Sequence, residues 1–197
     1  MAFTTINKPN EYFNTKIYTG TGSSNAITGV GFQPDWVWIK NRSAGEEHRL
    51  HDAVRGANKL LRTNGTYAEA TTTQDVMSFD SDGFTVGTET AVNANGQNIV
   101  AWNWLAGGTA SSNTDGSITS SVSANTTSGF SVVTYTGTAS SATVGHSLGV
   151  APSMIIVKNR DATSTWITFH KSLPNTNAVF LNLTNASNTD ISYFNDT

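Results

Sequence analysis

The chain has 197 residues, enough for one large or two small domains, and only 13% of them are charged while Ser, Thr, Asn and Gly are abundant. Such a composition favours sheets, turns and polar loops over long helices. The formal net charge of −3, without a run of Lys or Arg, argues against nucleic-acid binding, and the absence of cysteine excludes disulfides and thiolate metal sites.

The N-terminal segment 1–12 is polar and lacks the apolar stretch of a Sec signal peptide. No later run approaches the 18 apolar residues that a membrane-spanning helix needs. We therefore expect an N-terminal arm on a protein that is made in the cytoplasm and inserts into no membrane.

The first predicted elements are two strands and one short helix. Residues 13–18 alternate in character and lead into a Gly-Thr-Ser turn cluster, which predicts a strand. The apolar run 36–39 follows Pro34 and predicts a buried strand, since its length and β-branched content fit one. Residues 50–61 hold the one plausible short helix, although Gly56 weakens that prediction.

Short strands separated by turns follow. We expect strands at 77–79, 84–86 and 99–104, with turns between them at 80–83 and 93–96. Residues 109–129 are almost entirely Ser, Thr, Asn, Gly and Ala, a composition typical of a linker.

An internal repeat organises the chain. Residues 130–160 repeat the pattern of residues 13–42, including a Tyr-Thr-Gly turn, a proline and a Lys-Asn-Arg tripeptide. We interpret the tripeptide as structural, with contact to an acidic partner surface as the alternative. The second copy has no counterpart of the strands predicted at 84–86 and 99–104. Either the chain is a fragment, the alternative that we favour, or a neighbouring subunit supplies strands to an otherwise unpaired sheet edge.

These features predict an all-β fold of two tandem β-sandwich, jelly-roll-like units, the second incomplete, with at most one short helix in the first. The predicted organisation is an arm at 1–12, a first unit at 13–108, a linker at 109–129 and a partial second copy at 130–197.

Two tryptophan pairs are the candidate ligand-binding residues. Residues two apart on a strand point to one face, and neighbouring indoles can stack against sugar rings. The four residues are Trp36, Trp38, Trp102 and Trp104. The second copy has Met154 and Ile156 in place of the first pair, and this aliphatic replacement favours packing in the sandwich core over glycan stacking.

Two further clusters resemble metal sites. His48 and His51, next to Asp52, have a spacing that could share a metal on a helix, but no third ligand matches, and a polar loop explains them better. Residues 80–83 resemble the start of a calcium loop, yet position twelve of that loop is Ala91, so a β-turn is favoured. We predict no metal and no cofactor.

No arrangement of residues indicates catalysis. The chain has no Gly-rich phosphate loop after a strand, and nothing pairs two carboxylates for glycoside hydrolysis. We therefore predict that the protein is not an enzyme.

Several motifs resemble a repeat domain of structural proteins from tailed bacteriophages, known from marine phages in tail-fibre and virion proteins. The motifs are Tyr18-Thr19-Gly20, residues 31–42, Val54-Arg55-Gly56, residues 78–84 and residues 100–104, together with the opening residues 1–15. The second copy is similar to a related repeat through Pro152, Ile155, residues 158–160 and Trp166.

The resemblance implies a non-enzymatic virion component: a tail or head fibre or a capsid decoration, located in the virion and assembled with other virion proteins. It also implies a homo-oligomer, with a trimer favoured, that possesses no transferable catalytic residues. The alternative is a carbohydrate-binding module that acts as a receptor-binding adhesin, with a host surface glycan as partner.

Overall fold

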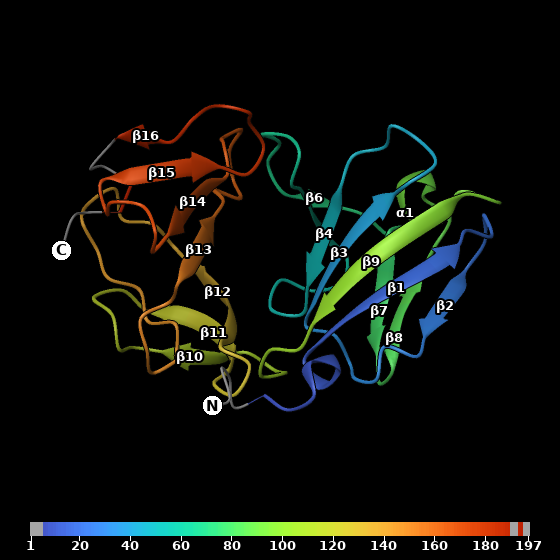
Figure 1. Ribbon diagram of the computed structural model, residues 1–197, viewed down its shortest axis with the longest axis horizontal. Coiled ribbons are helices and arrows are strands. Elements are labelled where there is room, and N and C mark those ends of the chain that lie inside the picture. The colour runs from blue at the N-terminus through green and yellow to red at the C-terminus, as the bar shows by residue number, and fades with distance from the viewer. Residues whose placement is uncertain (1–5, 190–192, 195–197) are drawn as a thin grey trace.

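The computed structural model describes residues 6–189 and 193–194, and nearly all of its regular elements are strands (Figure 1). Residues 1–5 of the predicted arm lie outside the described residues, and the rest of the arm contains a 3-10 turn, η1 (Pro9–Glu11). Within the described part of the chain, no helix is long and apolar enough to cross a membrane.

The first unit consists of two antiparallel sheets. The larger has six strands in the order β1 (Phe13–Thr19), β9 (Asn98–Trp104), β3 (Trp36–Asn41), β4 (Arg49–Asp52), β5 (Lys59–Arg62) and β6 (Ala70–Thr71). The smaller has three strands in the order β2 (Asn25–Thr28), β8 (Gly83–Val86) and β7 (Val76–Asp80). The short helix α1 (Thr90–Asn93) precedes β9 and adds Val92 to the core between the sheets.

Strand alternation builds the core of this unit. On β3, Val37 and Ile39 are fully buried against the smaller sheet, while Trp36 and Trp38, which alternate with them, point to the other face. The core cluster comprises Ile27, Val37, Ile39, Val76, Phe84, Val86, Val92, Ile99 and Ala101. The first unit is therefore a β-sandwich with one face of each sheet turned inward.

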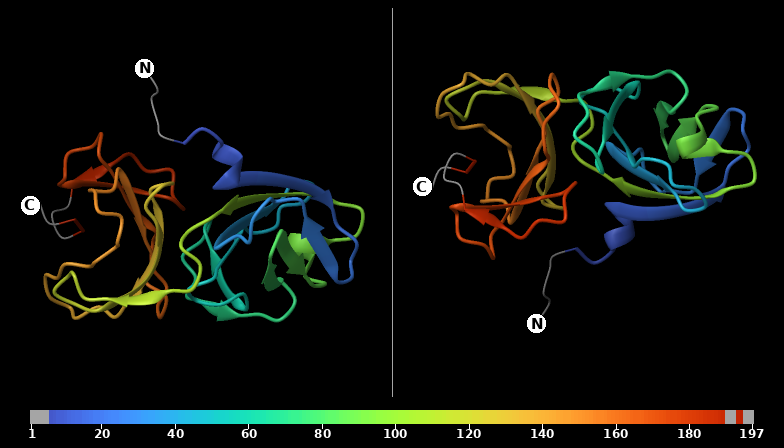
Figure 2. Two further views of the ribbon diagram at one scale, coloured as in Figure 1. Left: turned by 90° about the horizontal axis from the view of Figure 1, so that it is seen from below. Right: turned by 90° about the horizontal axis from the view of Figure 1, so that it is seen from above.

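The second unit has two smaller sheets. One contains β10 (Ser111–Asn113), β11 (Ser120–Asn125) and β12 (Phe130–Tyr135), and the other contains β13 (Met154–Val157), β14 (Ile167–His170), β15 (Asn177–Phe180) and β16 (Asn188–Thr189). The two units lie side by side, and the chain passes from β9 into β10 (Figures 1 and 2).

The repeat seen in the sequence extends to strand pairing. Lys59 pairs with Thr71 between β5 and β6, and their counterparts Asn177 and Thr189 pair between β15 and β16. The pairing of β3 with β4 is likewise matched by that of β13 with β14. The four strands β13–β16 therefore reproduce β3–β6.

The repeated lysine builds the same turn in both copies. Lys40 Nζ donates to the carbonyl oxygens of Ala44 and Glu46 at 3.2 and 2.7 Å. Lys158 Nζ donates to the carbonyl oxygen of Ala162 and to Ser164 Oγ, both at 3.1 Å. The repeated Lys-Asn pair is thus explained by the loop that joins two strands.

The all-β, sandwich-like fold is confirmed, but two local predictions are wrong. Residues 50–61 form parts of β4 and β5 around a turn, because all four β4 residues are buried and the sheet satisfies their backbone. Residues 109–129, expected to be a linker, contain β10 and β11, where small side chains such as Ser120 and Ser123 are buried.

Candidate functional site

The four candidate tryptophans form one block on the outer face of the larger sheet. Trp104 lies opposite both Phe13 and Trp36 in the neighbouring strands, and Trp102 lies opposite Trp38. The rings of Trp38 and Trp102 meet edge to face with centroids 5.9 Å apart. Two i, i+2 pairs from strands far apart in sequence therefore become a single aromatic surface.

The second unit packs against this aromatic surface. The Phe130 ring lies 5.9 Å from Trp36, edge to face, and 6.1 Å from Trp104, stacked. Trp166 is only 2% exposed and packs with Leu50 and Leu61 of the first unit. The tryptophans are therefore part of the contact between the two units.

This position differs from both sequence-based interpretations. None of the four tryptophans belongs to the core cluster of the sandwich, so the interpretation that we favoured was wrong. Each is half-buried, and Trp36 and Trp104 have Phe130 against them, which leaves less ring surface for a sugar. The aliphatic replacement in the second copy has a simple explanation, because Ile156 packs into the same contact.

Trp166 also forms polar contacts across the two units. Its Nε1 donates to the carbonyl oxygens of Arg62 and Gly65 at 3.0 and 3.2 Å. The carbonyl groups of a turn in the first unit are thereby satisfied by the second unit. Because the indole is both buried and hydrogen-bonded, Trp166 fixes the relative position of the units.

A chain of alternating charges runs beside the aromatic contact. Asp52 pairs with Arg55 at 2.5 Å, and Arg55 pairs with Glu69 at 3.0 Å. Arg160 of the second unit binds both carboxylate oxygens of Glu69, at 2.8 and 2.9 Å. Burial raises the pKa of Glu69, but the hydrogen bonds from the two arginines outweigh it and lower the pKa overall.

The charge network also explains Arg160, the last residue of the tripeptide in the second copy. Arg160 finds its acidic partner, Glu69, within the same chain. A bidentate Arg–carboxylate pair has a defined geometry, so it adds orientation to the contact that the aromatic rings provide.

The histidine cluster has the environment of a structural site. His51 is buried, and its Nδ1 donates to the carbonyl oxygen of Ala57 at 2.7 Å. Burial lowers the pKa of His51 to about 3, helped by the charges of Arg55 and Arg49 and opposed by the Ala57 hydrogen bond. Across the described ranges, no three His, Cys, Asp or Glu residues are grouped to hold a metal ion.

The segment 80–83 is a tight turn between β7 and β8, as expected. Asp82 accepts hydrogen bonds from the backbone N–H groups of Gly29 and Gly31 at 2.9 and 2.7 Å, and these bonds lower its pKa. Asp80 accepts from the hydroxyl groups of Ser78 and Thr85. Both carboxylates are therefore used within the fold.

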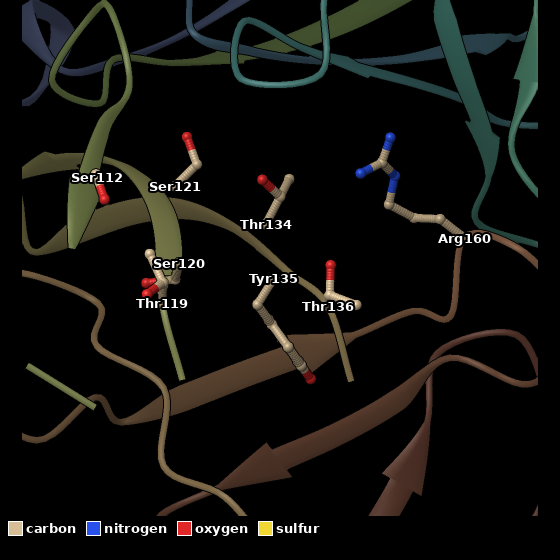
Figure 3. Close-up of a pocket in the computed structure, with 8 residues that line it drawn as sticks. All are labelled: Ser112, Thr119, Ser120, Ser121, Thr134, Tyr135, Thr136 and Arg160. Carbon is tan, nitrogen blue, oxygen red and sulfur yellow. The ribbon is translucent and has the colours of Figure 1, made fainter. Parts of the chain in front are cut away.

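A polar cavity of about 360 Å³ lies beside the sheet of β10, β11 and β12, with Arg160 of the loop after β13 at one side (Figure 3). It is lined by Ser112, Thr119, Ser120, Ser121, Thr134, Tyr135, Thr136 and Arg160. Figure 3 shows Thr134 and Thr136 on the side of Arg160, with Tyr135 pointing to the opposite side. Its only charged residue, Arg160, is already paired with Glu69, so the lining consists mainly of hydroxyl groups.

Sequence reasoning singled out the tryptophan pairs but missed the residues that cover them. The sequence pattern identified Phe130 and Trp166 only as parts of the repeat, and it gave no reason to select Glu69. The one available signal was that Trp166 has a histidine, His48, as its counterpart in the first copy. A large aromatic residue that appears in only one of two repeats indicates a contact specific to that copy.

Comparison with known proteins gives one match. No curated protein matches the chain significantly. No solved structure matches it either. The match to a domain family of unknown function, DUF7483, covers residues 8–197 and so includes both units and the segment between them. The chain therefore belongs to the DUF7483 family.

Proposed function

We propose that the chain is a non-enzymatic structural component of a phage virion: a tail or head fibre or a capsid decoration. The starting point is the resemblance of its repeated motifs to virion proteins of tailed phages. The observation that carries the proposal is the position of the aromatic and charged side chains. Tryptophans, arginines and carboxylates form contacts between two β-rich units.

The described surface fits a building block better than a binding pocket. Two cavities of about 360 and 370 Å³ are bordered mostly by hydroxyl groups, glycines and loop backbone. Ligand sites usually combine apolar walls with a few converging polar groups. A protein built from repeated sheets and tight polar loops instead suits stacking and assembly.

The solution mass of the purified chain tests this proposal. By light scattering on a sizing column, we expect a stable trimer of about 63 kDa, three times the chain mass of 20.9 kDa. A monomer at all concentrations would contradict the assembled-fibre proposal. If that monomer also bound glycans, and lost binding on Trp102→Ala, the adhesin alternative would replace it.

A further inference from the structure

The two units differ at one strand position. In the first unit, β9 lies between β1 and β3 and is hydrogen-bonded to both. By the sequence repeat, β12 corresponds to β1 and β13 corresponds to β3. Yet β12 and β13 belong to separate sheets, and no strand of the described residues lies between them. The edge of β13 that corresponds to the β9-paired edge of β3 is therefore unpaired in the described part of the chain.

The backbone of β13 presents hydrogen-bonding groups at this edge. The N–H of Lys171 donates to the carbonyl oxygen of Ser153 at 2.9 Å, on the side of β14. In an antiparallel pair, successive residues alternate in direction, so Met154 and Ile156 direct their N–H and C=O groups away from β14. In the first unit, the corresponding groups of Trp36 and Trp38 face β9.

Side chains near this edge are more exposed than their counterparts. Tyr18 is half-buried, packs against the core and donates its hydroxyl proton to the carbonyl oxygen of Val92 at 2.7 Å, whereas its counterpart Tyr135 is 44% exposed. Met154 is 50% exposed, although it begins a strand in the middle of a repeat. Exposed apolar side chains beside an unpaired strand edge are typical of a surface that binds another strand.

The polar cavity lies at one end of the same position. Thr136 and Arg160, which border the cavity, correspond to Thr19 and Arg42 of the first unit. In that unit, Asn98 fills the space between them: it pairs with Thr19 and accepts a hydrogen bond from the Arg42 N–H at 2.8 Å. One side of the cavity is thus formed by the counterparts of the two residues that flank Asn98 in the first unit.

We propose that the position between β12 and β13 binds an extended strand with the sequence pattern of β9, antiparallel to both strands. The pattern is Asn-Ile-Val-Ala-Trp-Asn-Trp, apolar on both faces, with Trp on the face that meets Phe130 and Ile156. The chain's own β9 is already buried between β1 and β3, so a second copy cannot supply it without opening its own sandwich. This inference depends on the repeat alone and is independent of the virion proposal.

The repeat also specifies the register. In the first unit, Trp104 lies opposite Phe13 and Trp36, so the last tryptophan of the bound strand lies opposite Phe130 and Met154. The opposite end of the bound strand then lies near Thr136 and Arg160, the counterparts of Thr19 and Arg42. Strand addition of this kind derives its affinity from backbone hydrogen bonds and its specificity from alternate side chains.

A labelled peptide with the sequence of residues 97–105 tests the proposal by fluorescence anisotropy. We expect saturable binding that Met154→Pro weakens about fivefold relative to Met154→Ala, because only proline removes the N–H at the edge. A peptide in which Val100 is replaced by proline is the control for backbone pairing. Absence of saturable binding, or equal affinity for both peptides, would overturn the proposal.

Disulfide trapping tests the register, because the chain contains no cysteine of its own. With Met154→Cys, a peptide carrying cysteine at the Trp104 position should cross-link, since paired strands bring Cα atoms within disulfide reach. A peptide with cysteine at the Ile99 position should not, because it lies about 17 Å along the strand. Equal cross-linking of both peptides would refute the register. A disulfide dimer of Met154→Cys formed without peptide would show that the edge pairs with a second copy of β13, and would overturn the proposal.

Discussion

His51 occupies a position of the repeat at which the two copies have different aromatic rings. It lies on the inner side of β4 opposite Val37, fully buried, with its Nδ1 proton bonded to the Ala57 carbonyl oxygen. Its counterpart in the second copy is Phe169, which packs against Phe194 at 5.5 Å. Both copies therefore place a flat ring at this position, fully buried in the first and half-buried in the second, and burial keeps the imidazole neutral.

This burial predicts a pH-dependent stability. The pKa of His51 is lowered from 6.5 to about 3, so below pH 6.5 only the unfolded chain gains its proton. The free energy of unfolding should fall by about 1.4 kcal/mol per pH unit between pH 6.5 and 3 from this residue alone. In His51→Phe this contribution should be absent, which urea unfolding at pH 7, 6 and 5 can measure. Parallel pH profiles of the two proteins would contradict the assignment, because other titrating groups are common to both.

At the level of elements, the sequence predicted the strands that alternate and missed those that do not. Strands β1, β3 and β9 were predicted because apolar residues alternate or cluster beside turn residues. Strand β4, Arg-Leu-His-Asp, has no such pattern, because its polar residues are buried by ion pairs and hydrogen bonds. Those partners come from distant parts of the chain, and a local pattern does not reveal them.

Gly83 on β8 lies in close contact with the backbone of β2 in the smaller sheet. Gly83 has a φ of +151°, which L-residues rarely adopt, and a Cβ there would collide with the carbonyl oxygen of Ile27 on β2. Gly83→Ala should therefore destabilise the fold by about 3 kcal/mol, since backbone strain adds to a steric clash. Gly96→Ala is the matched control: its φ is +73° with open space around it, and about 1 kcal/mol is expected. Equal losses in chemical denaturation would show that the contact with β2 is unimportant.

For the whole molecule, the contact between the units was the least predictable feature. The tryptophan pairs were identified from their spacing, and that spacing correctly implied a shared face. The pairing of β3 with β9 brings the two tryptophan pairs onto one face of the sheet. Phe130 and Trp166 of the second unit cover that face. A single sequence contains the repeat, but not the docking of one copy on the other.

That docking should make the two units unfold together. Trp36→Ala removes a ring that contacts Phe130 but leaves the sandwich core untouched, so the loss should fall mainly on the contact between units, at about 2–3 kcal/mol. Calorimetry should show one two-state transition for the original chain and a broadened or double transition for the variant. Ile17→Ala is the control, because Ile17 lies on the same sheet face but is 64% exposed, and its loss should stay within about 0.5 kcal/mol. If both variants kept a single transition at similar temperatures, the aromatic contact would not couple the units, and the cooperativity would have to come from the Glu69–Arg160 pair instead.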